Sequence, residues 1–371
     1  MASARTFITE LLKKADVEIG GGRPQDIVVH DERLFNRVIR YGSLGLGEAY
    51  MDGWWDTPAL DEFFNKVLRA HLEKKFKINF ASVTAVVGAF LFNQQSRLGA
   101  TRVIKEHYDL SAELYMSFLD PYNQYTCGYF KNTDDLNVAQ EQKLDLICKK
   151  LQLKRGDRVL DIGCGWGGFV KYAAEHYGVR VTGITLSREQ LAYAQEFTKG
   201  LNVELRLQDY RDVHDTFDKI LVCGMIEHVG YKNYREIMEV VERNLADDGL
   251  FLLHTIGYHV STVISDPWIT KYIFPGGQLP SITQIGKAIE GLFLVEDLHN
   301  FSAYYDKTLM AWFKNFDAAW PKLKEKYDER FYRMWKYYLL SCAGVFRARE
   351  SQLWQIVLSK KGVPGGYTSV R

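Results

Sequence analysis

Short apolar stretches alternate with amphipathic ones through the middle of the chain, and this alternation predicts the fold. Five runs rich in Val, Ile and Leu have the length and composition of strands. They are Arg158–Ile162, Arg180–Thr185, Val203–Gln208, Lys219–Met225 and Leu250–Ile256. Segments between them have apolar residues at helical spacing, namely Phe169–Tyr177, Arg188–Lys199 and Tyr231–Leu245. Strands that alternate with helices favour βαβ units, so we predict an α/β fold with a doubly wound, mostly parallel, Rossmann-like sheet.

The chain before residue 104 has a different pattern, in which helical spacing dominates. Helices are predicted at Thr6–Ala15, Arg33–Arg40, Leu60–Lys77 and Ile78–Phe92, with a short strand at Asp26–His30. The polar stretch Asn93–Arg102 has the composition of a linker. A chain of 371 residues exceeds what one hydrophobic core usually serves. We therefore predict a smaller α+β or helical domain at residues 1–92, a linker at 93–103 and a larger domain at 104–371.

Two neighbouring helical segments of the smaller domain differ in character. The first carries a basic side, formed by Lys66, Arg69, His71, Lys74, Lys75 and Lys77. The second, Ile78–Phe92, is apolar and aromatic. Such a pair suits binding to an anionic lipid surface. A solvated face beside a buried helix explains the pattern equally well, so both interpretations stay open.

Aromatic residues are frequent, at 14% of the chain, and this suggests a large apolar binding surface in addition to a core. The insertion Asp266–Pro280 contains Trp268, Tyr272 and Phe274. We predict that it forms a lid over an apolar cleft. The later aromatic stretch Thr308–Tyr338 is predicted to be helical.

Composition narrows the class of protein further. The net charge of +1 argues against a dedicated nucleic-acid binder. Five cysteines without a C-x-x-C pair, and no signal peptide, indicate a cytoplasmic protein without structural disulfides or a metal site. No apolar run reaches the roughly 20 residues of a spanning helix.

The stretch Val159–Gly168 joins the first predicted strand to the first helix through a glycine-rich turn. Asp161 stands two residues before Gly163, and Gly165 and Gly167 complete a G-x-G-x-G pattern. Glycine lets the backbone bend tightly and lets a ligand approach the main chain. The spacing differs from the G-x-G-x-x-G of dinucleotide sites, where a helix N-terminus receives a pyrophosphate. S-adenosylmethionine, which has no phosphates, fits better, and an ordinary tight turn is the alternative.

A second glycine-rich stretch, Gly42–Trp55, has three alternating glycines. Alternating glycines are also found in phosphate-binding loops. Because no Lys-Ser or Lys-Thr follows them here, a turn that enters an aromatic helix is the favoured interpretation.

Polar residues follow the predicted strands at the sheet edge where ligands bind. They are Thr185, Ser187 and Gln190 after the second strand, Gln208 and Asp209 after the third, Glu227 and His228 after the fourth, and His254 within the fifth. Generic methyltransferases often place an acid after the second strand to bind ribose hydroxyls, and this chain has Thr185 and Ser187 there. Considered alone, His254, Cys127 and Tyr305 are more often buried packing residues than catalytic groups.

These motifs occur together, in order, in one family that the sequence resembles. It is similar to the bacterial cyclopropane-fatty-acyl-phospholipid synthases and, more distantly, to the mycolic acid cyclopropane synthases. The matching stretches are Gly42–Trp55, Lys105–Leu110, Tyr125–Tyr129, Val159–Gly168, Thr185–Gln190, Glu227–Gly230, His254–Gly257, Asp266–Pro275, His299–Asp306 and Cys342–Arg349. The resemblance implies that the larger domain is a methyltransferase catalytic domain and that the smaller one associates with lipid.

The resemblance also implies the site residues. Contacts to S-adenosylmethionine are implied for Tyr125, Thr126, Val159, Leu160, Asp161, Ile162, Gly163, Cys164, Gly165, Trp166, Gly167, Thr185, Leu186, Ser187, Gln190, Gln208 and Asp209. A bicarbonate ion is implied at Cys127, Glu227, His254, the backbone of Ile256, and Tyr305. Cys342 matches a cysteine assigned to the active site, and no metal is implied.

The implied chemistry explains these residue types. A cis alkene of an unsaturated acyl chain attacks the sulfonium methyl, and loss of a proton from the resulting carbocation closes a cyclopropane ring. The base must survive beside a strong electrophile, which a thiolate or free imidazole would not. A bicarbonate ion oriented by Glu227 and His254 avoids alkylation. Aromatic faces stabilise the cation by about 0.5–2 kcal/mol each, and an aromatic lid excludes water.

The implied partners are phospholipid with unsaturated acyl chains and the anionic inner face of the membrane, to which a cytoplasmic protein binds peripherally. No nucleic acid is expected, and a homodimer is compatible with the resemblance. Two other functions compete. One is an S-adenosylmethionine-dependent N-methyltransferase of small amines, and the other is a lipid-binding protein without catalysis.

Overall fold

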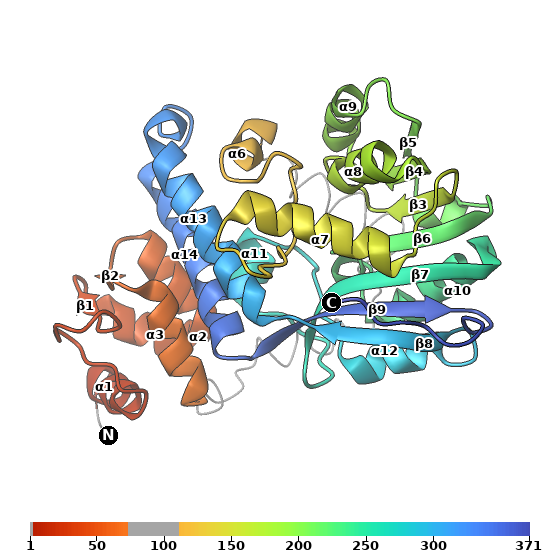
Figure 1. The fold of residues 1–371 in the computed structure, drawn as a ribbon. Coiled ribbons are helices and arrows are strands. Elements are labelled where there is room, and N and C mark those ends of the chain that lie inside the picture. The colour runs from red at the N-terminus through yellow and green to blue at the C-terminus, as the bar shows by residue number, and fades with distance from the viewer. Residues whose placement is uncertain (1–2, 73–110) are drawn as a thin grey trace. The chain divides into compact units, whose positions relative to one another are not determined.

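A computed structural model describes residues 3–72 and 111–371 (Figure 1). These residues form two compact units. The first consists of residues 3–72, Ile264–Pro275 and Tyr305–Ser351. The second consists of residues 111–263, Gly276–Tyr304 and Gln352–Arg371. The predicted linker at 93–103 lies outside the described residues, so the predicted domain boundaries stay a prediction.

The second unit is built on a seven-stranded sheet in the order β5-β4-β3-β6-β7-β9-β8. Its strands are β3 (Arg158–Ile162), β4 (Arg180–Thr185), β5 (Val203–Leu207), β6 (Phe217–Cys223), β7 (Leu245–Tyr258), β8 (Leu294–Asn300) and β9 (Ser351–Ser359). Strands β3 to β7 pair in parallel, while β8 and β9 pair antiparallel. The predicted doubly wound, mostly parallel sheet is confirmed. Strand order reverses at β3, and ligands of such sheets bind beyond the carboxyl ends near that point.

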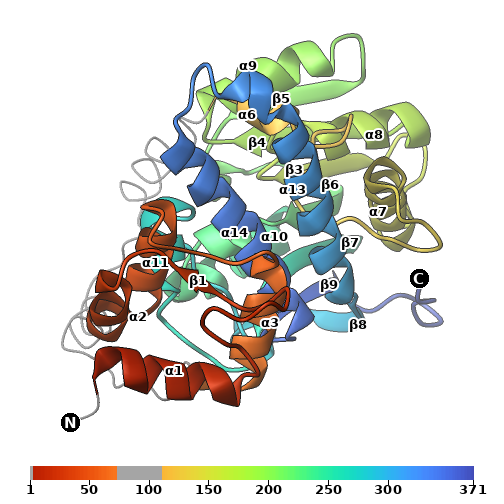
Figure 2. The same ribbon diagram turned by 90° about the vertical axis from the view of Figure 1, so that its left-hand side faces the viewer.

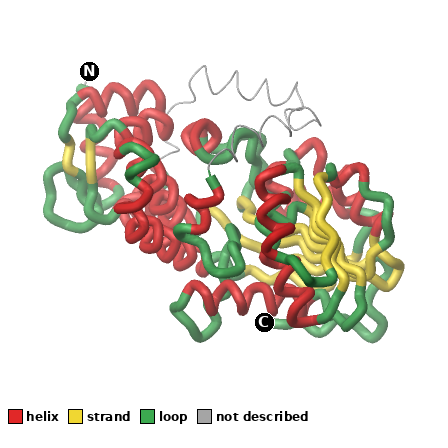
Figure 3. Tube along the Cα trace, turned by 90° about the horizontal axis from the view of Figure 1, so that it is seen from above, coloured by secondary structure: helices red, strands yellow, loops and turns green. Residues whose placement is uncertain are grey.

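Helices lie on either side of the strands, as Figure 3 shows. They are α6 (Ala112–Met116), α7 (Leu136–Lys150), α8 (Gly168–Tyr177), α9 (Arg188–Phe197), α10 (Tyr234–Asn244) and α12 (Ile282–Ile289). Three begin at a side-chain cap: Asp135 accepts from Val138 N, Ser187 from Gln190 N, and Ser281 from Gln284 N. The three helices predicted between the strands are present as α8, α9 and α10, with ends that differ by a few residues.

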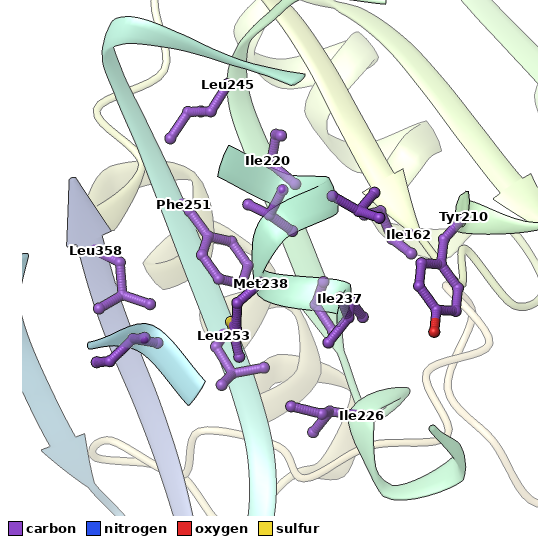
Figure 4. Close-up of a cluster of buried hydrophobic side chains, with 14 of the residues drawn as sticks. Ile162, Tyr210, Ile220, Ile226, Ile237, Met238, Leu245, Phe251, Leu253 and Leu358 are labelled. Atoms are coloured by element: carbon purple, nitrogen blue, oxygen red, sulfur yellow. The ribbon is translucent and has the colours of Figure 1, made fainter. Parts of the chain in front are cut away.

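Alternate residues of each strand supply two separate cores, because successive side chains point to opposite faces of a sheet. Leu160 and Ile220 lie in the core that includes Ile237 and Met238 of α10, which Figure 4 shows in part. The neighbouring Val159 and Leu221 lie in the opposite core, with residues of α7 and α8. Burial on both faces explains why these strands are nearly continuous apolar runs in the sequence.

The first unit is mainly helical, as Figure 2 shows. It contains α1 (Ala4–Lys14), α2 (Arg33–Met51), α3 (Leu60–Arg69), α11 (Pro267–Tyr272), most of α13 (Ala303–Leu323), α14 (Glu329–Arg347), and the antiparallel pair β1 (Val28–Val29) and β2 (Trp55–Asp56). Its core is aromatic: the ring centroids of Tyr50 and Trp55 are 5.2 Å apart, and those of Trp268 and Tyr337 are 4.5 Å apart. Arg347 of α14 forms ion pairs with Asp61 and with Asp306.

The glycine-rich stretch Gly42–Trp55 is mostly helix α2, with a kink at Gly42, where φ is 58°. A Cβ atom added at Gly47 would lie 2.4 Å from Cδ1 of Trp268. The missing side chain therefore lets the Trp268 ring lie directly on α2, and Glu48 beside it pairs with Lys271 of α11 at 2.6 Å. These glycines serve helix packing, and the phosphate-loop interpretation finds no support here.

Parts of two lipid-related predictions lie outside the described residues, namely the segment Ile78–Phe92 and the basic residues Lys74, Lys75 and Lys77. The described part of the basic helix is α3, on which Lys66 pairs with Asp16 at 2.9 Å. In the described ranges, no helix is both long and apolar enough to cross a membrane. The predicted lid begins with the short helix α11 of the first unit, where Trp268 is buried; its role as a lid stays a prediction.

Candidate active site

The turn after β3 combines a buried acid with glycines in the left-handed region. Asp161 is buried, and burial raises the pKa of its carboxyl to about 7. The positive charge of Lys143 on α7 partly opposes this rise in pKa. The N–H groups of Gly163 and Cys164 both donate to Ile184 O at 3.0 Å, which ties the turn to β4. Gly165 has φ 53°, and no atom of a described residue lies within 4 Å of an added Cβ there, so the main chain is open to a ligand.

The flanking residues of this turn are fixed by the core. Val159, Leu160 and Ile162 are fully buried β3 residues, so their backbone is what a ligand at the strand end meets. Cys164 is buried as well. Trp166 lies between Tyr115 and Tyr193, with ring centroids 5.6 Å and 5.5 Å away. A Cβ added at Gly167 would lie 2.9 Å from Cβ of Ala194, which shows close packing of the turn on α9.

The polar residues after β4 and β5 are held by their own turns. Thr185 donates to Gln190 Oε1 at 3.1 Å and accepts from Ser187 N at 3.1 Å, across Leu186. After β5, Gln208 donates to Asp212 O at 2.8 Å, and Asp209 pairs with Arg211 at 3.0 Å. The structure therefore brings the predicted cofactor residues of three neighbouring strands to one edge of the sheet.

The loop that carries Tyr125, Thr126 and Cys127 lies against the carboxyl end of β6. A Cβ added at Gly224 would lie 2.8 Å from Cγ2 of Thr126, and Cys223 Sγ is 3.9 Å from Thr126 Oγ1. Cys127 is fully buried, and its thiol donates to Gly128 O at 3.2 Å. The ring of Tyr125 packs edge-on against that of Tyr115 at 5.2 Å.

Glu227 and His254 lie on neighbouring elements at the ends of β6 and β7. Glu227 belongs to the 3₁₀ helix η3 (Ile226–His228), which follows β6, and its Oε1 accepts from Ile256 N at 2.8 Å. His254 is paired in register with Cys223, and its Nδ1 is 3.2 Å from Nε2 of Gln355 on β9. The three predicted positions Glu227, His254 and Ile256 are thus adjacent.

Burial controls the charge of these groups. It raises the pKa of Glu227 to about 6 and lowers the pKa of His254 well below its usual range, so the imidazole is neutral at pH 7. Burial also lowers the pKa of the adjacent His228 to about 4. Glu227 Oε2 and His254 Nε2 are buried and make no hydrogen bond to the part of the chain that the structure describes. A buried polar atom without a hydrogen bond lowers the stability of the fold by about 1–3 kcal/mol. This pair is therefore suited to a small ligand that can donate and accept hydrogen bonds.

Tyr305 and Cys342 lie in the first unit. The Tyr305 ring is buried and stacks on Phe346 with centroids 4.5 Å apart. Burial raises the pKa of the Cys342 thiol to about 12, so this group is a neutral thiol at pH 7. Their predicted roles in the active site stay predictions.

Lys143 of α7 is a site residue that the sequence analysis missed. It is fully buried, and its ammonium donates to Thr126 Oγ1 at 2.9 Å and to Gln124 Oε1. One turn earlier, Gln140 donates to Thr126 O at 2.8 Å. A signal was present, because Gln140, Lys143 and the buried Ile147 share one helical face at spacings of three and four residues. Polar residues on an apolar face mark buried polar contacts.

Comparison with known proteins identifies the family. Residues 95–356 match the family described as mycolic acid cyclopropane synthetase. The chain is also 54% identical over 362 residues to a cyclopropane-fatty-acyl-phospholipid synthase of Escherichia coli (strain K12), which covers 98% of this chain and 94% of that protein. The predicted resemblance is confirmed.

Solved structures agree. A cyclopropane synthase from Mycobacterium tuberculosis has a TM-score of 0.66 at 30% identity, covering 70% of this chain and 98% of that one. A mycolic acid cyclopropane synthase complexed with SAH and CTAB has a TM-score of 0.65 at 32% identity, with the same coverage of both chains. Coclaurine N-methyltransferase has a TM-score of 0.70 at 24% identity, covering 85% of this chain and 99% of that one. At this identity, the similarity is evidence for a shared fold only.

The family match extends over most of the chain, and the glycine-rich turn follows β3, as the sequence predicts. The chain therefore belongs to the mycolic acid cyclopropane synthetase family, and it is an S-adenosylmethionine-dependent enzyme of that family.

Proposed function

We propose that this enzyme transfers a methylene group from the methyl of S-adenosylmethionine to the cis double bond of unsaturated acyl chains in phospholipid, forming a cyclopropane ring. One observation carries the proposal. The identity to the Escherichia coli synthase extends over 98% of this chain, and so includes residues before the family match begins at residue 95. The two proteins are therefore similar in the N-terminal region as well as in the methyltransferase fold. A substrate that both proteins share accounts for this similarity.

We assign the methyl donor to the turn after β3 and to the ends of β4 and β5. The open main chain at Gly165 and the buried carboxyl of Asp161 support this assignment. The methyl donor carries a positive charge that a carboxylate attracts, and it has polar groups that can bond to the exposed backbone. Thr185, Ser187 and Gln190 hold one another in place and so present a fixed surface beside it.

We assign a bicarbonate ion to the group formed by Glu227, His254 and Cys127. The fit rests on the two buried atoms without partners, Glu227 Oε2 and His254 Nε2. A bound bicarbonate would supply an oxyanion base that an electrophilic methyl alkylates less readily than a thiolate. His254, neutral because of burial, orients such an ion by a hydrogen bond, and Glu227 exchanges a proton with it near its pKa of about 6. The N–H of Ile256, already bound to Glu227 Oε1, fixes the carboxylate plane.

The membrane is the source of the substrate, so we propose peripheral binding to anionic lipid on the inner face of the membrane, with a homodimer as a compatible assembly. Lys66, Arg69 and His71 are the described members of the predicted basic side. Neutralising Lys66 and Arg69 together with Lys74, Lys75 and Lys77 is expected to weaken sedimentation with anionic vesicles several-fold at low salt. Affinity for S-adenosylmethionine, measured by calorimetry, serves as the control. Unchanged sedimentation would favour the alternative interpretation, in which these basic residues form a solvated face and do not bind lipid.

The experiment that tests the activity uses purified protein, vesicles of unsaturated phosphatidylethanolamine and phosphatidylglycerol, and S-adenosylmethionine labelled in its methyl group. We expect labelled acyl chains heavier by one methylene in mass spectra. Small amines are offered in a parallel reaction. Label in the amines but not in the lipid would favour an N-methyltransferase, and vesicle binding without any transfer would favour a lipid-binding protein.

A further inference from the structure

The helix α7 carries a buried lysine that the assigned chemistry does not yet use. Lys143 is fully buried, and burial lowers the pKa of its ammonium while nearby acidic groups oppose this. Its two hydrogen-bond acceptors, Gln124 Oε1 and Thr126 Oγ1, are neutral. An ammonium has three N–H donors, so one donor has no acceptor in the described ranges.

A second buried lysine of α7 shows how such a charge is usually balanced. The side chain of Lys150 is fully buried too, but its ammonium lies 3.6 Å from the carboxylate of Asp297. No carboxylate lies within 4.0 Å of the Lys143 ammonium among residues 3–72 and 111–371. The carboxyl groups of Asp120 and Asp161 favour the charged form of the Lys143 ammonium without forming an ion pair with it within the described residues. A buried charge that lacks a direct ion pair is costly, so the remaining donor of Lys143 is suited to an anion that binds beside it.

Contacts place this ammonium beside the group assigned to bicarbonate. Thr126, which Lys143 holds, precedes Cys127 and touches Cys223 on β6. Cys223 is in turn the register partner of His254 on β7. Lys143 thus contacts the loop that stands next to His254 and carries Cys127.

The position of the ammonium is rigid. The neighbouring Leu144 and Ile147 anchor α7 in the core, and Gln140 bonds Thr126 O at 2.8 Å from the preceding turn. A charge that is fixed before the ligand arrives needs no reorganisation when the ligand binds.

We propose that Lys143 is a positioning residue that supplies the positive charge for the anion bound at Glu227 and His254; this rests on the proposed bicarbonate site. The neutral imidazole and the acidic Glu227 provide no positive charge of their own. Lys143 therefore sets the affinity for bicarbonate rather than the proton transfer itself.

The test measures turnover of labelled S-adenosylmethionine with unsaturated phospholipid vesicles while bicarbonate is titrated into carbon-dioxide-free buffer. Lys143→Met keeps the length of the side chain and removes the charge, and Lys143→Arg keeps the charge. We expect Lys143→Met to raise the half-activating bicarbonate concentration about 10- to 100-fold, as for the loss of a charged hydrogen bond, with recovery of the rate at saturating bicarbonate. Lys143→Arg should restore most of the affinity.

Lys150→Met is the matched control, because it removes a buried lysine from the same helix. It should lower the melting temperature and change the half-activating concentration far less than Lys143→Met does, because the charge of Lys150 acts on His254 more weakly than that of Lys143. If Lys143→Met does not fold, Lys143→Gln takes its place.

The possible outcomes separate the two proposals. If the wild type responds to bicarbonate and Lys143→Met responds at the same concentration, the role of Lys143 is overturned and the ion site stands. If Lys143→Met loses affinity for S-adenosylmethionine in calorimetry in proportion to its activity, Lys143 only holds the loop, and the inference is again overturned. A wild type that ignores bicarbonate overturns the ion site, and the inference with it.

Discussion

The two halves of the carboxyl edge of the sheet satisfy their polar groups differently. At β4 and β5 the polar side chains bond to their own turns: Thr185 to Gln190, and Asp209 to Arg211. At β6 and β7, Glu227 Oε2 and His254 Nε2 make no such bond within the described part of the chain. A large methyl donor such as S-adenosylmethionine can be bound by a preformed surface and exposed backbone. A small ion instead needs side-chain atoms that have no other hydrogen-bond partner. Asp161 lies in the first half, where the positively charged donor is assigned.

The largest expected effect is in the second half, at Glu227. Glu227→Gln keeps the acceptor for Ile256 N but removes the charge and the exchangeable proton. Loss of a well-placed proton acceptor lowers turnover about 10²–10⁴-fold, measured with vesicle-bound unsaturated phospholipid. Affinity for S-adenosylmethionine should stay at the wild-type value, because that half of the edge is untouched. Wild-type turnover in this variant would make Glu227 a structural residue.

The next effect probes the open backbone of the first half. Gly165→Val places a branched side chain in the open space at φ 53° and should weaken S-adenosylmethionine binding at least about 100-fold, as measured by calorimetry. Gly156→Val is the matched control, since Gly156 also has a positive φ of 92° and open space but precedes β3 at its other end. Equal losses in both variants would mean that backbone strain, and not the ligand, accounts for the result.

The third prediction concerns pH and again separates the halves. The pKa of Asp161 is raised to about 7, so the carboxyl gains a proton, and loses its attraction for the positively charged donor, as pH falls through 7. Affinity for S-adenosylmethionine should therefore decrease up to about tenfold per pH unit below that point and be constant above it. Asp161→Asn should bind weakly with little dependence on pH, and Glu227→Gln should keep the wild-type profile. If the affinity of the wild type for S-adenosylmethionine does not change with pH, Asp161 does not contribute to binding of the methyl donor.

The smallest expected effect is at Cys127. Cys127→Ser replaces a weak donor by a hydroxyl of similar shape, whose one O–H can donate either to Gly128 O, as the thiol does, or to a bound ion. Turnover should fall less than about tenfold, with unchanged affinity for the methyl donor. A loss as large as that of Glu227→Gln would show that the thiol itself takes part in the chemistry.

The sequence predicts the parallel part of the sheet well, because strands buried on both faces are apolar runs with little ambiguity. It does not predict β8, whose residues Glu296, Asp297 and Asn300 are poor strand formers. That strand exists because β9 pairs with it from more than fifty residues away in the chain.

In the candidate active site, too, the sequence predicts local patterns but not contacts between distant residues. The glycine turn and the strand ends are local patterns, and they lie where the sequence indicates. Lys143 is different, because a lysine on a helix is expected to face solvent. The helical face that it shares with Gln140 and Ile147 is visible in the sequence, but its hydrogen-bond partners Gln124 and Thr126 are evident only in the folded chain.

The contact of Trp268 with α2 bears on how this protein is made. The chain alternates between its two units in six segments, so it passes from one to the other five times. During synthesis, α2 and α3 emerge long before Trp268 and α14 (Glu329–Arg347), against which they pack. The apolar faces of α2 and α3 therefore lack their packing partners, and stay exposed or bound by a chaperone, until nearly the whole polypeptide has left the ribosome.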